Sequence, residues 1–352
     1  GAGFDPAYVG AGDVHVKWKE NAYRVYSRLA VSRAGQDEDR DTGWESALYF
    51  SKFAGRFGGQ AYVDACSRGF NANDLGFMRR NDRTQAGAHV FYKFLEPYWF
   101  ARRSGFNANV WQHGNFDGDN LSGGINFNMW HELHNYWGFW MGFDHNRDAW
   151  DDLVTRGGPV MRSPGSNRWA MDLWTDDRNA ISGRMSASVR WGLGGDNLST
   201  WNGFEIELKP ASNFEIEIEP GYRFSRRDAQ WLENIDSDGD DEDDRFVFGE
   251  LTNKTLEIGV RSTLAFTSFL STQLFLQPFV TTGDYGKIKE LARERSYDFV
   301  PYDDLEDNPD FHSRSLRFNL VTRWEYAPGS TIFVVWQQTG DDDEGDNIFL
   351  IK

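Results

Sequence analysis

The sequence predicts an all-β protein, an antiparallel transmembrane β-barrel of about 16 to 18 or more strands with short periplasmic turns and long extracellular loops. Three observations predict this class. Apolar residues recur at every second position far more often than at helical spacing. Connections alternate between short turns and long polar loops, as the two rims of a membrane barrel require. The chain is also rich in aromatic residues, at 16% of its 352 residues, yet its mean hydropathy is only −0.63. A barrel permits both because only alternate residues face lipid.

The clearest strand runs from Leu316 to Tyr326, where apolar and polar residues alternate up to a turn at 327–330, and a second strand follows over 332–336. The same period predicts fourteen further strands, near residues 8–19, 22–33, 42–53, 57–68, 83–94, 101–112, 121–129, 136–145, 167–175, 181–191, 204–208, 214–218, 256–266 and 272–276. Residues 348–352 have the composition of one more strand that is cut off before its end. About 17 strands are therefore expected.

Every second connection is short. We assign the short set, near residues 20, 55, 96, 132, 178, 211, 268 and 328, to the periplasmic side. The long set lies near residues 34–41, 69–82, 113–118, 145–166, 193–198, 226–245, 281–312 and 339–346. With 17 strands the first and last run the same way, whereas closed bacterial barrels usually have an even number. We therefore expect residues 1–352 to be a single barrel domain that lacks N-terminal residues and the end of its last strand.

Charge and motifs exclude several classes of function. The net charge of −17 repels phosphate, and no basic cluster offsets it, so nucleic acid is excluded as a partner. The lone Cys66 rules out an intramolecular disulfide framework and a Cys-rich zinc site. No run of about 18 apolar residues predicts a membrane-spanning helix. Nucleophile elbows and phosphate-binding glycine loops are absent from the sequence, so we expect no enzymatic activity and no cofactor beyond Ca²⁺.

Tryptophan and tyrosine residues gather at the predicted strand ends, which is typical of the aromatic girdles at membrane interfaces, although ordinary sheet aromatics would explain them too. If the alternating apolar residues face lipid, charges of both signs face the lumen. This lumen-lining set comprises Arg184, Arg190, Glu205, Glu207, Glu215, Glu217, Glu257, Arg261, Arg317, Arg323 and Glu325. Such a lining would orient polar solutes in a water-filled pore. Alternatively, the charges pair across neighbouring strands and stabilise the lumen.

An acidic segment at 234–244 places oxygen ligands at alternate positions around a glycine, as a calcium loop does. The candidate Ca²⁺ ligands are Asp236, Asp238, Asp240 and Glu242. Position twelve is Arg245 in place of the bidentate Glu, which argues against an EF-hand. The alternative is a solvated acidic loop. Further acidic clusters at 37–41 and 341–346 suggest bridging by divalent cations to lipopolysaccharide phosphates on the same rim.

Three stretches, at residues 73–82, 270–285 and 323–331, resemble a family of large bacterial outer-membrane proteins of unassigned function. The resemblance covers roughly residues 70 to 340. In that family a carbohydrate-binding-like module of the family 9 type commonly precedes a long C-terminal β-barrel. The resemblance implies a location in the bacterial outer membrane, and it supplies no reaction.

These observations predict a porin-like or transport protein for polar solutes, without catalysis. The alternative is a structural or surface-binding barrel that anchors acidic loops, or a carbohydrate-binding module, at the cell surface. The expected partners are outer-membrane lipid and lipopolysaccharide, and a glycan or a small polar solute. The sequence leaves the oligomeric state open.

Overall fold

The computed structural model describes residues 7–35, 41–236, 245–305 and 308–342. Within these residues the chain is all-β and antiparallel, with one 3₁₀ turn at Asn73–Leu75. The strands are β1 Tyr8–Trp18, β2 Tyr23–Ala34, β3 Asp41–Lys52, β4 Phe57–Cys66, β5 Arg83–Phe94, β6 Ala101–Gly114, β7 Asn120–Leu133, β8 Gly138–Asn146, β9 Ala149–Asp151, β10 Met161–Ser163, β11 Ser166–Trp174, β12 Ile181–Gly192, β13 Leu198–Ala211, β14 Phe214–Ile235, β15 Arg245–Ala265, β16 Leu270–Leu291, β17 Phe299–Pro301, β18 Phe311–Ala327 and β19 Ser330–Asp342. Among the described residues, no helix has the length and hydropathy of a membrane-spanning segment.

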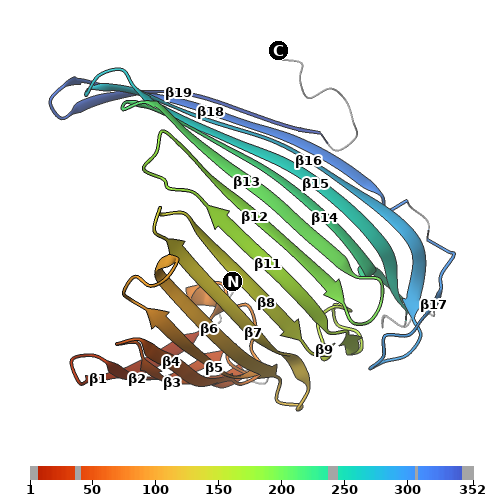
Figure 1. Cartoon of the computed structure of the whole chain (residues 1–352). Helices are drawn as coiled ribbons and strands as arrows, with labels where there is room; N and C mark the ends of the chain where they lie inside the picture. The colour runs from red at the N-terminus through yellow and green to blue at the C-terminus, as the bar shows by residue number, and fades with distance from the viewer. Residues whose placement is uncertain (1–6, 36–40, 237–244, 306–307, 343–352) are drawn as a thin grey trace, which may run out of the picture. The chain divides into compact units, whose positions relative to one another are not determined.

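The chain divides into two compact units. Unit 1 consists of residues 1–130 and 142–166, and unit 2 of residues 131–141 and 167–352. In unit 1 the strands β1 to β6 each pair antiparallel with the next strand along the chain. In unit 2 the same holds from β12 to β16, then through β18 to β19, while β17 pairs with the end of β16. Figure 1 shows the long strands of unit 2, from green to blue.

The predicted all-β antiparallel class is confirmed, and all sixteen strands predicted over residues 8–336 correspond to strands of the structure. The short turns also lie where they are predicted. One of them, between β18 and β19, has Gly329 at a φ of 77°, a conformation that favours glycine because it has no Cβ. The partial strand expected at 348–352 lies outside the described residues.

Three of the predicted long loops are wrong in part, because strands continue through them. β14 runs on to Ile235 and β15 begins at Arg245, so most of 226–245 that is described is paired strand. β16 continues to Leu291, and β19 continues to Asp342. The prediction equated strand length with the apolar stretch. Polar segments also form strands when neighbouring backbones satisfy their N–H and C=O groups, as they do here.

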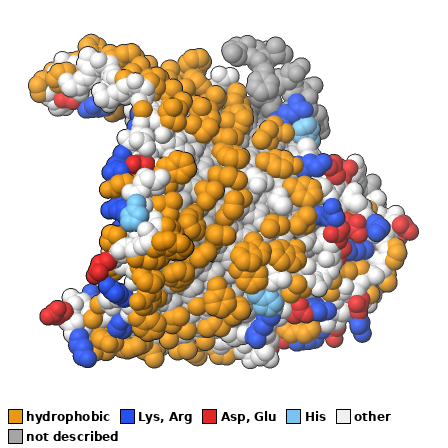
Figure 2. All heavy atoms as spheres, in the orientation of Figure 1, with side chains coloured by type: hydrophobic (Ala, Val, Ile, Leu, Met, Phe, Trp, Pro, Cys, Tyr) orange, Lys and Arg blue, Asp and Glu red, His pale blue; other side chains and the backbone are white. Residues whose placement is uncertain are grey.

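Each unit has one polar and one apolar sheet face. In unit 2 the side chains of Ile181, Phe204, Ile206, Leu256 and Trp324 are 42–69% exposed. Register places Ile181 opposite Leu208 and Tyr222 opposite Leu256, so these side chains share one face, the apolar face. The other face, the polar face, bears the charged residues of the same strands. Figure 2 shows apolar side chains gathered on the viewed surface, with charged side chains mainly along its margins.

Few apolar side chains are buried among the described residues. In unit 1, Phe70 is 3% exposed and forms a buried cluster with the small residues Ala30 on β2 and Cys66 on β4. Phe70 belongs to the segment 67–82, whose Asn71 N–H donates to Ser32 Oγ at 2.8 Å. In unit 2, Val247 and Phe248 are fully buried near the start of β15. The sheets therefore lack a continuous apolar core and present much of their apolar surface outward.

Candidate functional site

The polar face of unit 2 carries charges on five adjacent strands, β12 to β16. The antiparallel register brings Arg184 opposite Glu205, Glu207 opposite Glu217, and Glu217 opposite Arg261. Directly opposite residues in an antiparallel pair have Cβ atoms about 5 Å apart. Side chains separated widely in the sequence therefore meet on this face because each strand turns back beside its predecessor.

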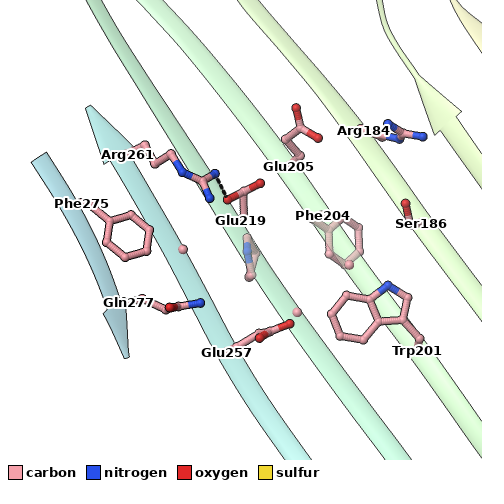
Figure 3. Close-up of a pocket in the computed structure, with 14 residues that line it drawn as sticks. Arg184, Ser186, Trp201, Phe204, Glu205, Glu219, Glu257, Arg261, Phe275 and Gln277 are labelled. Carbon is pink, nitrogen blue, oxygen red and sulfur yellow. Dashed lines mark hydrogen bonds and ion pairs between the residues drawn. The ribbon is translucent and has the colours of Figure 1, made fainter. Parts of the chain in front are cut away.

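A cavity of about 270 Å³ lies on this face (Figure 3). Its lining includes Arg184, Trp201, Glu205, Glu219, Glu257 and Arg261. Four of these six belong to the predicted lumen-lining set, so the structure brings Arg184, Glu205, Glu257 and Arg261 together. Phe275 and Gln277 from β16 complete one wall.

Ion pairs engage both arginines of the cavity. Arg261 Nη1 contacts Glu219 Oε2 and lies 3.4 Å from Glu217 Oε2, and Figure 3 marks the contact with Glu219. Arg184 Nε lies 3.4 Å from Asp172 Oδ1 on β11. In the part of the chain that the structure describes, neither Glu205 nor Glu257 has a basic group within ion-pair distance.

The remaining members of the predicted set lie on the same face but outside the cavity. Glu207 accepts from Ser182 Oγ at 2.7 Å and lies 2.9 Å from Lys209 Nζ. Arg323 pairs with Glu325 at 2.9 Å. Register places the others as follows: Arg190 opposite Ser199, Glu215 opposite Thr263, and Arg317 opposite Gln277 and Thr339. Several of the charges are thus paired, as the alternative interpretation of this set expected.

The sequence prediction missed Trp201 and Glu219. Both continue the period-two pattern, since Glu219 follows Glu215 and Glu217 on the same face of β14. The sequence prediction placed this strand at 214–218, so it ended one residue before Glu219. Trp201 was assigned to a strand end and an aromatic girdle. Its role depends on which residues lie across from it, which the sequence does not show.

Glu205, Glu217 and Glu219 place carboxylate oxygens within 4.8 Å of one another. Carboxylates in such a group can bind a hard cation. Here the Arg261 guanidinium already contacts two of the three carboxylates. The cluster is therefore an internally paired acidic group with one further carboxylate, Glu205, beside it.

Of the predicted Ca²⁺ ligands, only Asp236 is among the described residues. Asp238, Asp240 and Glu242 lie outside them. Most of the acidic cluster at 37–41, and the part of the second cluster from 343 on, also lie outside the described residues. The calcium site stays a prediction.

Unit 1 carries its own polar face. Arg28 and Arg83 both donate to Glu45 Oε1, at 2.8 and 3.0 Å. An amide ladder crosses β6, β7 and β8, where Asn109 donates to Asn126 at 2.7 Å and Asn126 donates to Asp144 at 2.8 Å. These hydrogen bonds satisfy the donors and acceptors of the polar side chains on this face.

The chain thus belongs to the class of large antiparallel all-β proteins with one polar and one apolar sheet face. The family model for a domain of unknown function, DUF5916, matches residues 1–348, and the chain belongs to that family. No curated protein and no solved structure matches the chain. The family is uncharacterised, so membership adds no activity to the geometry described above.

Proposed function

We propose that the protein is a bacterial outer-membrane β-barrel that forms a porin-like passage for polar solutes and performs no catalysis. In this proposal both units contribute strands to one barrel domain. The apolar faces contact outer-membrane lipid, and the polar faces line the lumen. The solute and the oligomeric state are left to experiment.

The observation that carries this proposal is an apolar stripe on β14, half-buried to exposed, whose length matches the height of a membrane. On β14 the apolar face bears Phe214, Ile216, Ile218, Pro220, Tyr222 and Phe224. The stripe then ends, because Arg226 and Asp228 follow at the same spacing. Phe224 lies opposite Lys254 and Tyr222 opposite Leu256, so the stripe ends at the same level on the next strand. Its length of about 10 residues is what a tilted strand needs to cross the apolar part of a membrane.

Water-soluble proteins do not expose apolar surface on this scale. Their largest apolar patches usually cover a few hundred Å², and larger ones mark membrane or protein contacts. Here apolar side chains are exposed on strand after strand in both units. Burying them in lipid is favourable at about 25 cal/mol per Å². Closure of the sheet would also remove its unpaired edges, which are unfavourable in lipid.

Conductance tests the proposal. The full-length protein is purified from outer membranes in detergent, its folding is checked by heat-modifiable migration on gels, and it is inserted into planar bilayers. Discrete, salt-dependent current steps are expected. A folded, heat-modifiable protein without conductance would overturn the open passage and favour a barrel that anchors surface loops or a carbohydrate-binding module. Purification without detergent would overturn the membrane assignment.

A further inference from the structure

The floor of the cavity on the polar face of unit 2 is formed by glycines. Gly203 on β13 lies directly opposite Gly221 on β14. A Cβ at Gly203 would lie 3.1 Å from Trp201 Cζ2, and one at Gly221 would lie 2.5 Å from Trp201 Cη2. The indole therefore lies across both glycines and fills the space of their absent side chains. Such a ring is an aromatic platform on the surface of the sheet (Figure 3).

Carboxylates surround this platform. Glu257 Cγ would lie 3.2 Å from a Cβ at Gly221, so its stem and the indole approach the same glycine. Glu219 lies over Gly259 in the same way, with Oε2 2.9 Å from the position of a Cβ. Glu205 lies across the strand pair from Arg184. The lining has three carboxylates and two guanidinium groups, and the latter are engaged by Asp172, Glu217 and Glu219, so the cavity has an excess of negative charge.

The chain already places its own guanidinium groups against these rings. The Arg223 guanidinium lies 5.2 Å from the centre of the Trp201 ring, and that of Arg261 lies 5.6 Å from the centre of the Phe275 ring. Planar cations are attracted to aromatic faces and to carboxylates at once. Glu205 and Glu257 lie at separate positions of the cavity wall and have no ion-pair partner among the described residues, so each gives a further cation of this kind a place to bind.

We propose that this cavity is a selectivity site for organic cations that carry a guanidinium or primary ammonium group. The inference rests on the proposed passage and adds its substrate class. The cationic group binds Glu257, whose stem approaches the same glycine as the indole, or Glu205 further along the wall, and the apolar part of the solute lies on the Trp201 indole. An anion is disfavoured by the excess of carboxylates. A neutral sugar could stack on the Trp201 indole but would not be attracted by the negative charge of the carboxylates.

The test uses the full-length protein in planar bilayers with unequal KCl concentrations on the two sides, and agmatine as the probe. The variants are Glu205→Gln with Glu257→Gln, and Trp201→Leu. The control is Glu215→Gln with Glu325→Gln, which removes the same charge from the polar face outside the cavity. Heat-modifiable migration confirms that each variant folds, and Trp201→Phe replaces Trp201→Leu if the latter does not.

The expected wild-type channel is cation-selective and is blocked by agmatine. The double Gln variant in the cavity raises the half-blocking concentration about tenfold, Trp201→Leu raises it about threefold, and the control leaves it within about twofold. A conducting channel with no cation selectivity, or with equal block in all variants, would overturn the inference while the passage stands. Block by glucose in place of agmatine would assign the cavity to sugars and overturn it equally.

A second measurement separates the site from the passage. Agmatine binding is followed by calorimetry on the same proteins in detergent. If the cavity variants bind agmatine more weakly than the wild type and the control variant does not, the site is supported even in a barrel that conducts no current. A folded wild-type protein that does not bind agmatine would overturn the inference whatever its conductance.

Discussion

At the residue scale, glycines decide where other parts of the chain rest on the sheets. Gly43 on β3 lies directly beneath the backbone of Gly69 and Phe70. Phe70 reaches Ala30 and Cys66 only because these positions are small. The segment 67–82 is thereby held against the polar face of unit 1. In unit 2, Gly203 and Gly221 do the same for the Trp201 indole.

Gly43→Ala is expected to displace the segment 67–82, because the new Cβ would overlap the backbone of residues 69 and 70, which cannot move aside as a side chain can. Overpacking of this kind costs about 1–3 kcal/mol. Limited proteolysis should cut the segment faster in the variant. Gly12→Ala on β1 is the matched control, since no atom lies within 4 Å of its Cβ position. Equal cleavage of both variants and the wild type would contradict this role of Gly43.

A salt bridge makes the loops of unit 1 sensitive to acid. Arg80 donates to Asp152 through both guanidinium nitrogens, one of them at 2.8 Å. This contact holds the pKa of Asp152 below its usual value of 3.8. A carboxyl with a lowered pKa contributes stability above its unfolded pKa, and the contribution is lost as pH falls through the folded value.

We therefore expect the segments 67–82 and 147–165 to be protected from proteolysis at neutral pH and to lose protection only below about pH 4. Pepsin digestion across an acidic pH series measures this in wild type. In Arg80→Gln the protection should be reduced at the higher pH values, where the wild type keeps the ion pair, and should approach that of the wild type at the lowest pH, so that the acid dependence flattens. Unchanged acid dependence in Arg80→Gln would show that another group controls it.

At the element scale, β14, β15 and β16 are about twice as long as a membrane crossing requires. β14 has 22 residues, or about 70 Å at the usual rise per residue, whereas its apolar stripe ends at Phe224. The parts of β14 to β16 beyond the apolar stripe are covered by residues 292–305. There Val247, Phe248 and Tyr302 form the best-buried apolar cluster of unit 2. Burial raises the pKa of the nearby Tyr297 to about 12, so its phenol is neutral at physiological pH.

Phe248→Ala tests whether this extension has a stability of its own. Phe248 is fully buried, and its ring contacts that of Phe299, with ring centres 5.5 Å apart. The truncation should cost about 3–5 kcal/mol locally. Hydrogen exchange of residues 228–250 should accelerate, while exchange in the apolar stripe stays slow. Phe77→Ala is the control, since that side chain is 90% exposed. Loss of heat-modifiable folding would show that the extension and the rest of the strand fold as one.

These residues show which features of the fold and of the cavity can be predicted from the sequence. The sixteen longer strands between residues 8 and 336 were predictable, because period-two alternation can be recognised without knowing which strands pair. The three-residue strands β9, β10 and β17 were missed and lie in segments predicted as long loops. The full length of β14 to β16 was not predictable, because these strands remain paired beyond the residues where the apolar alternation ends. Four cavity residues were predicted by alternation alone. Glu219 was missed although it continues the alternation of Glu215 and Glu217, whereas the place of Trp201 over Gly203 and Gly221 depends on strand register.

At the scale of the whole molecule, the placement of apolar and polar side chains on opposite faces predicts the effect of an inserted charge. Ile206→Arg places a cation on the apolar face of β13, where the native side chain is 42% exposed. In a bilayer an arginine near the midplane costs about 2–4 kcal/mol. Gln273→Arg, on the polar face of β16, should cost little. Urea unfolding in lipid vesicles, followed by heat-modifiable migration, compares the two.

In a water-soluble protein the two substitutions would not differ in their effect on stability. There Ile206→Arg adds a charge to a surface that is already solvated, and both variants should be equally stable. Equal stability in vesicles would therefore argue against lipid contact at the apolar face. A greater loss for Gln273→Arg would reverse the assignment of the two faces.

The sequence by itself determined the fold class, the strand positions and the sorting of side chains to two faces, because all three follow from local alternation along one chain. Only the tertiary structure decided which charges meet, which glycines lie beneath Trp201 and which loop rests on β2 to β4. Those contacts depend on register between strands. A shift of one residue would turn every side chain of a strand to the other face, and the chain alone specifies that register only through the summed packing of its neighbours.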